Sequence, residues 1–346
     1  MIYKIFIRPF LFLMDPESTH NCVLNFFSKV RIFDPIIKFL YSPKNNVPIQ
    51  IGELTFRNKL GLSAGFDKNG AALKFWDVLG FSHIEVGTVT PLPQPGNPKP
   101  RMFRLKKDSA VINRLGFNNV GTDEIRKNIL NAKKTLSKDF IIGINIGKNK
   151  DTPIENIENS ISDYKICFEK LYDVADYFTL NISSPNTEKL RTLHDSENLS
   201  ELLSQIQILN KELSQKFSKN IKPVFLKISP DISNEDAVSV YENALAHNLT
   251  GIIATNTTIS RSGLSEDINE TGGLSGKPVK ILSDEILNIF NELNKNNTGH
   301  KLILIGSGGI FNSSDAKDKL KRGASLIQIY TGFIYEGPSI IKKILN

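Results

Sequence analysis

The chain has 346 residues, of which 40% are hydrophobic, so it is long enough to bury the core of one large barrel or of two ordinary domains. This composition excludes a disordered or fibrous protein, and Cys22 and Cys167, which lack CxxC spacing and nearby histidines, encode neither a disulfide framework nor a zinc site. The net charge of +7 comes from lysines scattered among Asn and Ile, so we expect no nucleic-acid partner and keep one only as an alternative.

Residues 1–41 form a distinct N-terminal segment that holds seven of the 21 phenylalanines. The pairs Asp15-Pro16 and Asp34-Pro35 each look like a helix N-cap followed by proline at the first helical position, which predicts two short helices. Apolar residues recur along both at helical spacing, and these stripes either dock on the main domain or face lipid. The content of Phe and basic residues favours lipid, although no stretch reaches the roughly 18 uninterrupted apolar residues of a membrane span.

From residue 50 onward, short β-branched runs alternate with polar, helix-like stretches. Several runs are apolar without alternation, as in parallel strands covered on both faces, and segments such as 235–246 and 313–322 are long enough for crossover helices. The pattern predicts an α/β fold, a (β/α)8 TIM barrel with a short N-terminal helical extension, and a doubly wound open sheet is the alternative. The predicted strands are 60–66, 83–89, 140–147, 177–183, 224–229, 251–257, 302–308 and 326–332.

Polar groups and glycines stand at the carboxyl end of every predicted strand. The first strand leads into Asp67-Lys68, the fourth into residues 181–186 (NISSPN), and the eighth into Tyr330-Thr331-Gly332. Because the carboxyl ends of all barrel strands meet at one mouth, we expect a single active site there. A polar residue at a single strand end can be explained by turn formation alone. Eight such ends together favour a binding site.

Two features indicate the kind of ligand. Gly308-Gly309 and Tyr330-Thr331-Gly332 follow the last two strands, and a predicted helix begins near Ser313, so backbone N–H groups and a helix dipole would bind a phosphate there. The Gly-Gly pair alone could equally be a turn, and no Walker or GxGxxG motif indicates ATP or NAD. Lys227 ends an apolar strand, so we interpret it as a charge aimed at a ligand, the alternative being a lysine that extends from the barrel rim to water.

At this point the sequence resembles a known family over almost its whole length. In combination and in this order, six motifs resemble those of the quinone-dependent (class 2) dihydroorotate dehydrogenase family: GFDKNG (65–70), EVGTVTP (85–91), NRLGFN (113–118), GINIGKN (143–149), NISSPNT (181–187) and TGGLSG (271–276). The segments DPESTH (15–20) and PRMFRL (100–105) also resemble that quinone-dependent class.

The resemblance implies a role for each matching residue. Ser184 matches the catalytic base of this class, where the soluble class has a cysteine, and Thr187 and Phe117 match its proton relay. Residues that match the quinone channel are His20, Arg104 and Tyr330. Residues that match the substrate site are Lys68, Asn113, Arg114, Leu115, Gly116, Phe117, Asn181, Asn186, Asn256 and Thr257. Residues that match the cofactor site are Ala64, Gly65, Phe66, Asp67, Lys68, Thr88, Asn145, Asn181, Lys227, Thr255, Ser275, Gly276, Gly308, Gly309, Tyr330 and Thr331.

The family's chemistry would then be that of this chain. It implies oxidation of (S)-dihydroorotate to orotate for UMP biosynthesis, with one FMN per chain, no metal, and ubiquinone or menaquinone as oxidant. Ser184 would take the C5 proton while the C6 hydride passes to flavin N5, which requires the substrate to lie flat on the flavin. Residues 1–45 would form the membrane and quinone-access segment and 46–346 the catalytic barrel. The protein would be peripheral on the cytoplasmic side of the inner membrane.

Two alternatives stay open. One is another FMN barrel that acts on a dihydropyrimidine or on dihydrouridine, of which the latter would need a tRNA-binding basic patch and a cysteine acid that this sequence does not show. The other is a non-catalytic, membrane-surface binding protein with the same fold, which would be colourless when purified.

Overall fold

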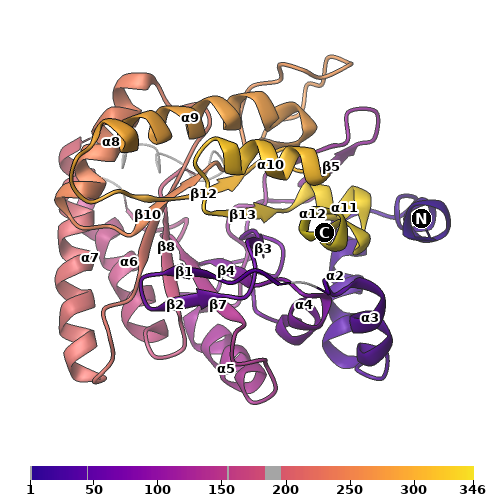
Figure 1. Ribbon diagram of the computed structural model, residues 1–346, viewed down its shortest axis with the longest axis horizontal. Helices are drawn as coiled ribbons and strands as arrows, with labels where there is room; N and C mark the ends of the chain where they lie inside the picture. The colour runs from indigo at the N-terminus through magenta and orange to yellow at the C-terminus, as the bar shows by residue number, and fades with distance from the viewer. Residues whose placement is uncertain (1, 45, 154–155, 184–195) are drawn as a thin grey trace.

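The computed structural model describes residues 2–44, 46–153, 156–183 and 196–346, and its centre is a closed barrel of eight parallel strands (Figure 1). Neighbours along the chain are neighbours in the barrel, and the last strand pairs with the first. The predicted TIM barrel is therefore confirmed, and the doubly wound alternative is wrong. The strands are β3 (Leu60–Leu62), β4 (His83–Val89), β7 (Ile141–Ile146), β8 (Tyr177–Asn181), β9 (Val224–Ile228), β10 (Gly251–Ala254), β12 (Ile303–Ser307) and β13 (Leu326–Ile329).

Most strands end earlier than the sequence predicts. The run 60–66 pairs only as Leu60–Leu62, and the run 251–257 pairs only as Gly251–Ala254. The residues beyond these ends leave the ladder and turn into the barrel mouth, where several line a cavity described below. Apolar character alone does not locate this boundary, because the residues just past the strands are buried as well.

Helices cover the outside of the barrel (Figure 1). Alternate strand residues separate into two clusters, so that Ile142, Ile144 and Ile146 pack with the helices while Ile141 points into the barrel. Burial on both faces explains why these strands read as continuous apolar runs. The predicted crossovers 235–246 and 313–322 are confirmed as two of the following helices. They are α4 (Leu73–Leu79), α5 (Gly121–Lys133), α6 (Ile157–Leu171), α7 (Ser196–Lys216), α8 (Asn234–Ala246), α9 (Lys280–Asn296), α10 (Ser313–Lys321), α11 (Thr331–Glu336) and α12 (Ser339–Leu345).

An apolar layer fills the amino-terminal end of the barrel. A hairpin of β1 (Ile49–Ile51) and β2 (Leu54–Phe56) packs Ile51 and Phe56 into this layer. Large rings fit inside because glycines face them: a Cβ at Gly61 would lie 2.1 Å from the His83 ring, and one at Gly143 would lie 2.1 Å from the Tyr177 ring. This end is therefore a packed core rather than a pore.

A second, antiparallel sheet stands beside the barrel mouth. It consists of β5 (Met102–Leu105), β6 (Ala110–Asn113) and β11 (Gly273–Gly276), with β6 in the centre and a 3-10 turn, η3 (Lys277–Val279), after β11. These segments carry the family motifs, but their pairing into a sheet was not predicted. Its pairing brings Asn113 opposite Gly273, although they are far apart in sequence.

The N-terminal segment forms a π-helical turn η1 (Tyr3–Ile7), α1 (Arg8–Leu11), α2 (Pro16–Lys29) and α3 (Asp34–Tyr41). Asp15 caps α2 as predicted, because its carboxylate accepts a hydrogen bond of 2.8 Å from the amide of Ser18. The predicted cap at Asp34 is wrong: Asp34 is the first residue of α3, and its carboxylate accepts instead from Arg31 Nε at 2.8 Å. The helix starts one residue early, so its N-cap position falls on Phe33, whose side chain cannot cap.

The apolar residues of this segment face two ways. Leu24, Phe27 and Ile37 pack against the core of the barrel domain. Leu13 and Phe39, in contrast, remain 81% and 82% exposed. Within the described ranges, no helix is both long enough and apolar enough to cross a membrane. The stripes therefore dock on the domain and also leave an uncovered apolar face.

Candidate active site

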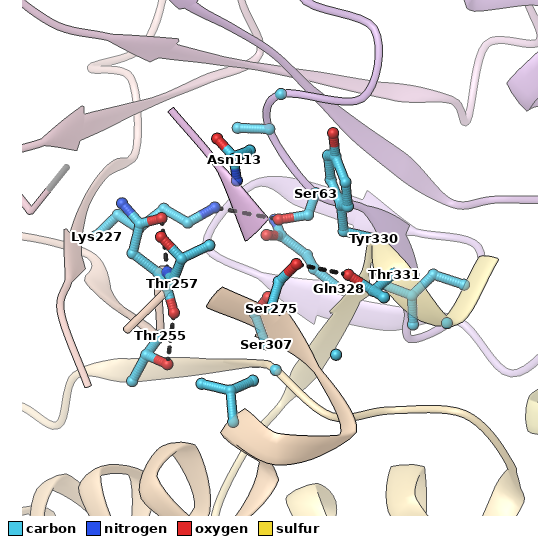
Figure 2. A pocket seen from close by; sticks show the side chains of 18 of the residues that line it. Ser63, Asn113, Lys227, Thr255, Thr257, Ser275, Ser307, Gln328, Tyr330 and Thr331 are labelled. Carbon is cyan, nitrogen blue, oxygen red and sulfur yellow. Dashed lines mark hydrogen bonds between the residues drawn. The ribbon is translucent and has the colours of Figure 1, made fainter. Parts of the chain in front are cut away.

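A polar cavity of about 1000 Å³, including the part open to solvent, lies at the carboxyl ends of the barrel strands (Figure 2). Its wall is completed by residues of β6 and β11 from the second sheet. The predicted residues that line it are Ala64, Gly65, Lys68, Thr88, Asn113, Leu115, Gly116, Phe117, Asn181, Lys227, Thr255, Asn256, Thr257, Ser275, Gly276, Gly308, Gly309, Tyr330 and Thr331. Positions spread over 268 residue numbers, from 64 to 331, thus meet in one place, as the convergence of strand ends predicts.

A chain of hydrogen bonds fixes the polar side chains on one side of the cavity. Thr88 Oγ1 donates to Asn145 Oδ1 at 2.6 Å, and Asn181 Nδ2 donates to Thr88 Oγ1 at 2.9 Å. Asn256 Nδ2 in turn lies 3.3 Å from Asn181 Oδ1. Asn145 does not line the cavity. Its Oδ1 accepts from both Thr88 and Asn181, so it orients these two lining residues from outside the cavity.

Lys227 enters the cavity from inside the barrel. Its side chain is only 5% exposed, and its Nζ lies 3.2 Å from Ser63 Oγ (Figure 2). The same Nζ lies 3.5 Å from the carboxylate of Glu85. It is therefore a buried, paired ammonium beside the cavity, and the alternative of a lysine extending from the rim to water is wrong.

Lys68 stands on the opposite strand-end loop, and its Nζ donates to Asn118 Oδ1 at 2.5 Å. Burial lowers the pKa of Lys68 to about 7, the nearby Arg101 adds to this lowering, and Glu17 opposes it. Arg101 and Glu17 form a nearly buried bidentate ion pair, with distances of 2.7 and 3.0 Å. A ligand carboxylate placed beside Lys68 would favour its protonated form.

The glycine-rich loop after β12 exposes backbone amides to the cavity. In the part of the chain that the structure describes, the N–H groups of Gly309 and Ile310 donate to no protein acceptor. Gly309 has φ +72°, and a Cβ there would lie 2.3 Å from Lys280 Cβ, so only glycine fits. The start of α10, where the helix dipole was predicted to bind the phosphate, offers fewer free amides. The N–H of Phe311 donates to Asp315, and the N–H of Asp315 donates to Asn312. An anion would meet the loop amides first.

Three predicted residues have their side chains elsewhere. The carboxylate of Asp67 accepts bonds of 2.8 Å from the amides of Ala71 and Ala72, so it shapes the loop that carries Lys68. Arg114 reaches Glu270 at 2.6 Å, outside the cavity. Phe66 lines a different cavity.

That second cavity is apolar and has a volume of about 1220 Å³, including the part open to solvent. It lies between the N-terminal helices and the barrel domain, and the predicted channel residues His20 and Arg104 both line it. Arg104 Nη1 is held by the carbonyls of Leu11 and Met14 at 3.1 and 3.0 Å. Burial lowers the pKa of His20 to about 4, so its ring is neutral at physiological pH.

Phe66 stands between the two cavities. Its ring packs edge-on against His20 at 5.1 Å, on the side of the apolar cavity, and against Tyr330 at 5.1 Å, on the side of the polar cavity. Tyr330, predicted for both cofactor and channel, lines only the polar cavity. A single aromatic layer thus separates the two sites.

The sequence reading missed several residues of the polar cavity. Gln328 is fully buried, and both polar atoms of its side chain lack a hydrogen-bond partner in the described structure. It is a polar residue within the apolar strand β13, the same signal that singled out Lys227. Ser307 and Gly332, which stand at predicted strand ends, also line the cavity, and the other lining residues not predicted are Ser63, Val279, Ile310, Phe311 and Ile329.

Ser184, Asn186 and Thr187 lie outside the described residues. Among the residues that are described, no group of three or more His, Cys, Asp or Glu side chains could hold a metal ion.

Comparison with known proteins identifies the family of this chain. Residues 47–346 match the family model described as dihydroorotate dehydrogenase. The chain belongs to the dihydroorotate dehydrogenase family. It is 45% identical over 348 residues to the dihydroorotate dehydrogenase (quinone) of Vibrio parahaemolyticus, covering 100% of this chain and 99% of that relative. It is 47% identical to the protein of the same name from Christiangramia forsetii, covering 99% and 97%.

Solved structures agree with this membership. Ligand-free dihydroorotate dehydrogenase from Eimeria tenella superposes with a TM-score of 0.84 at 35% identity, covering 95% of this chain and 93% of that one. The same enzyme in complex with ferulenol gives a TM-score of 0.85 at 34% identity, covering 95% and 89%. The family resemblance stated from the motifs is thus confirmed for the chain as a whole.

Proposed function

We propose that this chain oxidises dihydroorotate to orotate with a bound FMN and passes the electrons to a membrane quinone. One observation carries the proposal: a polar cavity at the barrel mouth and an apolar cavity under the N-terminal helices are connected by one ring contact, because Phe66 lines the apolar cavity and packs edge-on against Tyr330, which lines the polar one. Membership of the dihydroorotate dehydrogenase family, with relatives named as quinone-dependent, supports the same reaction. It also favours this reaction over that of another FMN barrel and over a non-catalytic binding protein.

The residues present suit a flavin mononucleotide. The loop amides of Gly309 and Ile310 would hold its phosphate, while Lys227 and the unpartnered amide of Gln328 would meet a ring that carries both hydrogen-bond donors and acceptors. When bound, FMN supplies the two-electron chemistry that connects hydride transfer from a substrate to a quinone.

The remaining polar groups suit a small, flat, anionic substrate. Lys68 would bind its carboxylate, while the amides of Asn113, Asn181 and Asn256 offer donors and acceptors to the ring. The hydrogen-bond chain that starts at Asn145 holds Asn181 and, through it, Asn256 in place before any ligand arrives, so less ordering is needed on binding.

Ser184 is our candidate for the base that takes the substrate proton, with Thr187 and Phe117 as the relay. A hydroxyl is a weak base in water, so this role requires a desolvated site and a path for the proton. Phe117 lines the cavity and is nearly buried, as such a site requires.

The quinone, ubiquinone or menaquinone, would enter the apolar cavity and meet His20 and Arg104 near Phe66. The uncovered apolar face of residues 1–45 would lie on the cytoplasmic side of the inner membrane, while residues 46–346 form the catalytic barrel. No partner nucleic acid enters this scheme.

The test is a two-stage stopped-flow experiment on the purified protein. Dihydroorotate should bleach the yellow flavin absorbance, and ubiquinone should restore it. Restoration by fumarate and not by quinone would contradict the proposed electron acceptor. No bound flavin, or no bleaching, would contradict the reaction itself.

Two variants test the assignment of Ser184 as the base. Ser184→Ala should retain flavin and lose most of the bleaching rate. Cys167→Ala is the matched control, because this thiol is buried against the outside of the barrel and burial raises its pKa well above the usual value. Cys167→Ala should bleach at the rate of the unaltered protein. Slow bleaching in Cys167→Ala together with a normal rate in Ser184→Ala would show that Ser184 is not the base.

A further inference from the structure

Glu85 is a buried carboxylate that no part of the proposed reaction uses. It projects from the middle of β4 into the barrel, and its side chain is 0% exposed. Thr179 Oγ1 donates to Glu85 Oε1 at 2.7 Å, and Asn145 Nδ2 lies 3.4 Å from Oε2. It does not line the polar cavity, so it touches no ligand bound there.

Packing alone does not explain a charge at this level of the barrel. The layer beneath it is largely apolar, and it is built from Ile141, Phe225, Ile253, Ile305 and Leu326 together with the ring of Tyr177. Burying a carboxylate costs free energy unless it is paired and hydrogen-bonded, so an apolar residue would serve a purely structural layer at least as well. The charge at Glu85 therefore calls for a partner that benefits from it.

That partner is Lys227, whose Nζ lies 3.5 Å from Glu85 Oε2 and 3.2 Å from Ser63 Oγ. An ammonium has three N–H donors. Within the described residues, one of them is donated to Ser63 Oγ while the Glu85 carboxylate lies at ion-pair distance, which leaves donor capacity for a ligand in the cavity. Figure 2 shows the side chain of Lys227 extended toward Ser63.

We propose that Glu85 is a positioning residue that holds the Lys227 ammonium at the cavity floor and offsets its charge, so that the pair sets the reduction potential of the bound flavin. This inference rests on the proposed function, since it needs a flavin in the cavity. An isolated Lys227 would present a full positive charge, whereas the Glu85–Lys227 pair presents a dipole. Positive charge favours the anionic reduced ring over the neutral oxidised ring, so the carboxylate limits how strongly the reduced form is held.

The test measures the flavin midpoint potential by equilibration with a reference dye. Glu85→Gln keeps the shape and removes the charge, and it should raise the potential. We expect the ratio of affinities for reduced and oxidised flavin to rise at least tenfold, which corresponds to about 30 mV for two electrons. Lys227→Met should lower the potential, and the double variant should lie closer to the unaltered protein than either single variant.

Thr179→Val is the matched control. It removes the 2.7 Å hydrogen bond to Glu85 but leaves both charges, so the potential should stay near that of the unaltered protein. A purely structural role for Glu85 predicts instead that Glu85→Gln and Thr179→Val lower stability alike and leave the potential unchanged, and that result would overturn the inference.

Two further outcomes are distinct. If Glu85→Gln does not hold flavin, Glu85→Asp retains the charge but withdraws it from Lys227 by one methylene. That variant should raise the potential, with a less than tenfold increase in the ratio of affinities for reduced and oxidised flavin. An unchanged potential would overturn the inference. If the unaltered protein binds no flavin, the proposed function fails. If it binds flavin and is reduced by dihydroorotate while Glu85→Gln leaves the potential unchanged, only the role of Glu85 fails.

Discussion

The ion pair between Glu17 and Arg101 joins α2 to the loop that precedes β5, and its removal should be costly. The two side chains are 9% and 7% exposed, with two contacts of 2.7 and 3.0 Å, and Arg101 Nη1 also donates to the carbonyls of Pro95 and Asn97 at 2.6 and 2.7 Å. Glu17→Met leaves the guanidinium buried with only these carbonyls. Breaking one side of a buried pair costs about 3–5 kcal/mol of unfolding free energy.

The assay is urea unfolding followed by tryptophan fluorescence, which reports on Trp76 in the barrel core. Lys99→Met is the control, because Lys99 is 64% exposed and lies 3.7 Å from the same carboxylate, so its loss should cost less than about 1 kcal/mol. The double variant Glu17→Met with Arg101→Met removes both charges and should cost less than the sum of the single variants. A loss for Glu17→Met no larger than that for Lys99→Met would refute the reasoning.

Three further predictions concern the two cavities. Lys68 has a pKa of about 7 in the free protein and binds a carboxylate only when protonated. The affinity for orotate should therefore be highest below pH 7 and fall by about tenfold per pH unit above it. The shift in flavin absorbance on binding measures this affinity. A flat profile would contradict this, and Glu17→Met should move the fall to lower pH. Phe66→Ala should cost about 3–5 kcal/mol in urea unfolding, since its ring packs on His20, Trp76, Tyr330 and Phe333; a loss below about 1 kcal/mol would show that the layer is not tightly packed. Gly309→Ala should weaken FMN binding to the apoprotein, measured by fluorescence quenching, because a Cβ there meets Lys280 at 2.3 Å, and unchanged binding would exclude this loop from the phosphate site.

The barrel was predictable because its strands are buried on both faces. Runs such as 251–254 are apolar without interruption, and the segments that follow the strands carry the polar groups that meet at the mouth. The cap at Asp15 was predictable because a cap acts on residues three positions away. In these cases the physical cause is local, or follows from the geometry common to all barrels.

Long-range pairing was not predictable. Nothing near Glu17 indicates that Arg101, 84 positions later, is its partner, and nothing near Asn113 indicates that Gly273 pairs with it. The first helices were missed because Pro9 interrupts an apolar run whose spacing fits no single period. Gln328 was overlooked although it carries the same signal as Lys227, since an uncharged residue in an apolar strand attracts less notice than a charge.

The glycines inside the barrel have a consequence for how the sequence can vary. Gly61 faces the His83 ring and Gly143 faces the Tyr177 ring, each within 2.1 Å of where a methyl group would stand. Neither glycine can acquire a side chain unless its ring-bearing neighbour shrinks at the same time. Divergence at these four positions must therefore proceed by paired replacement, and a redesign of the barrel interior should exchange the members of each pair together.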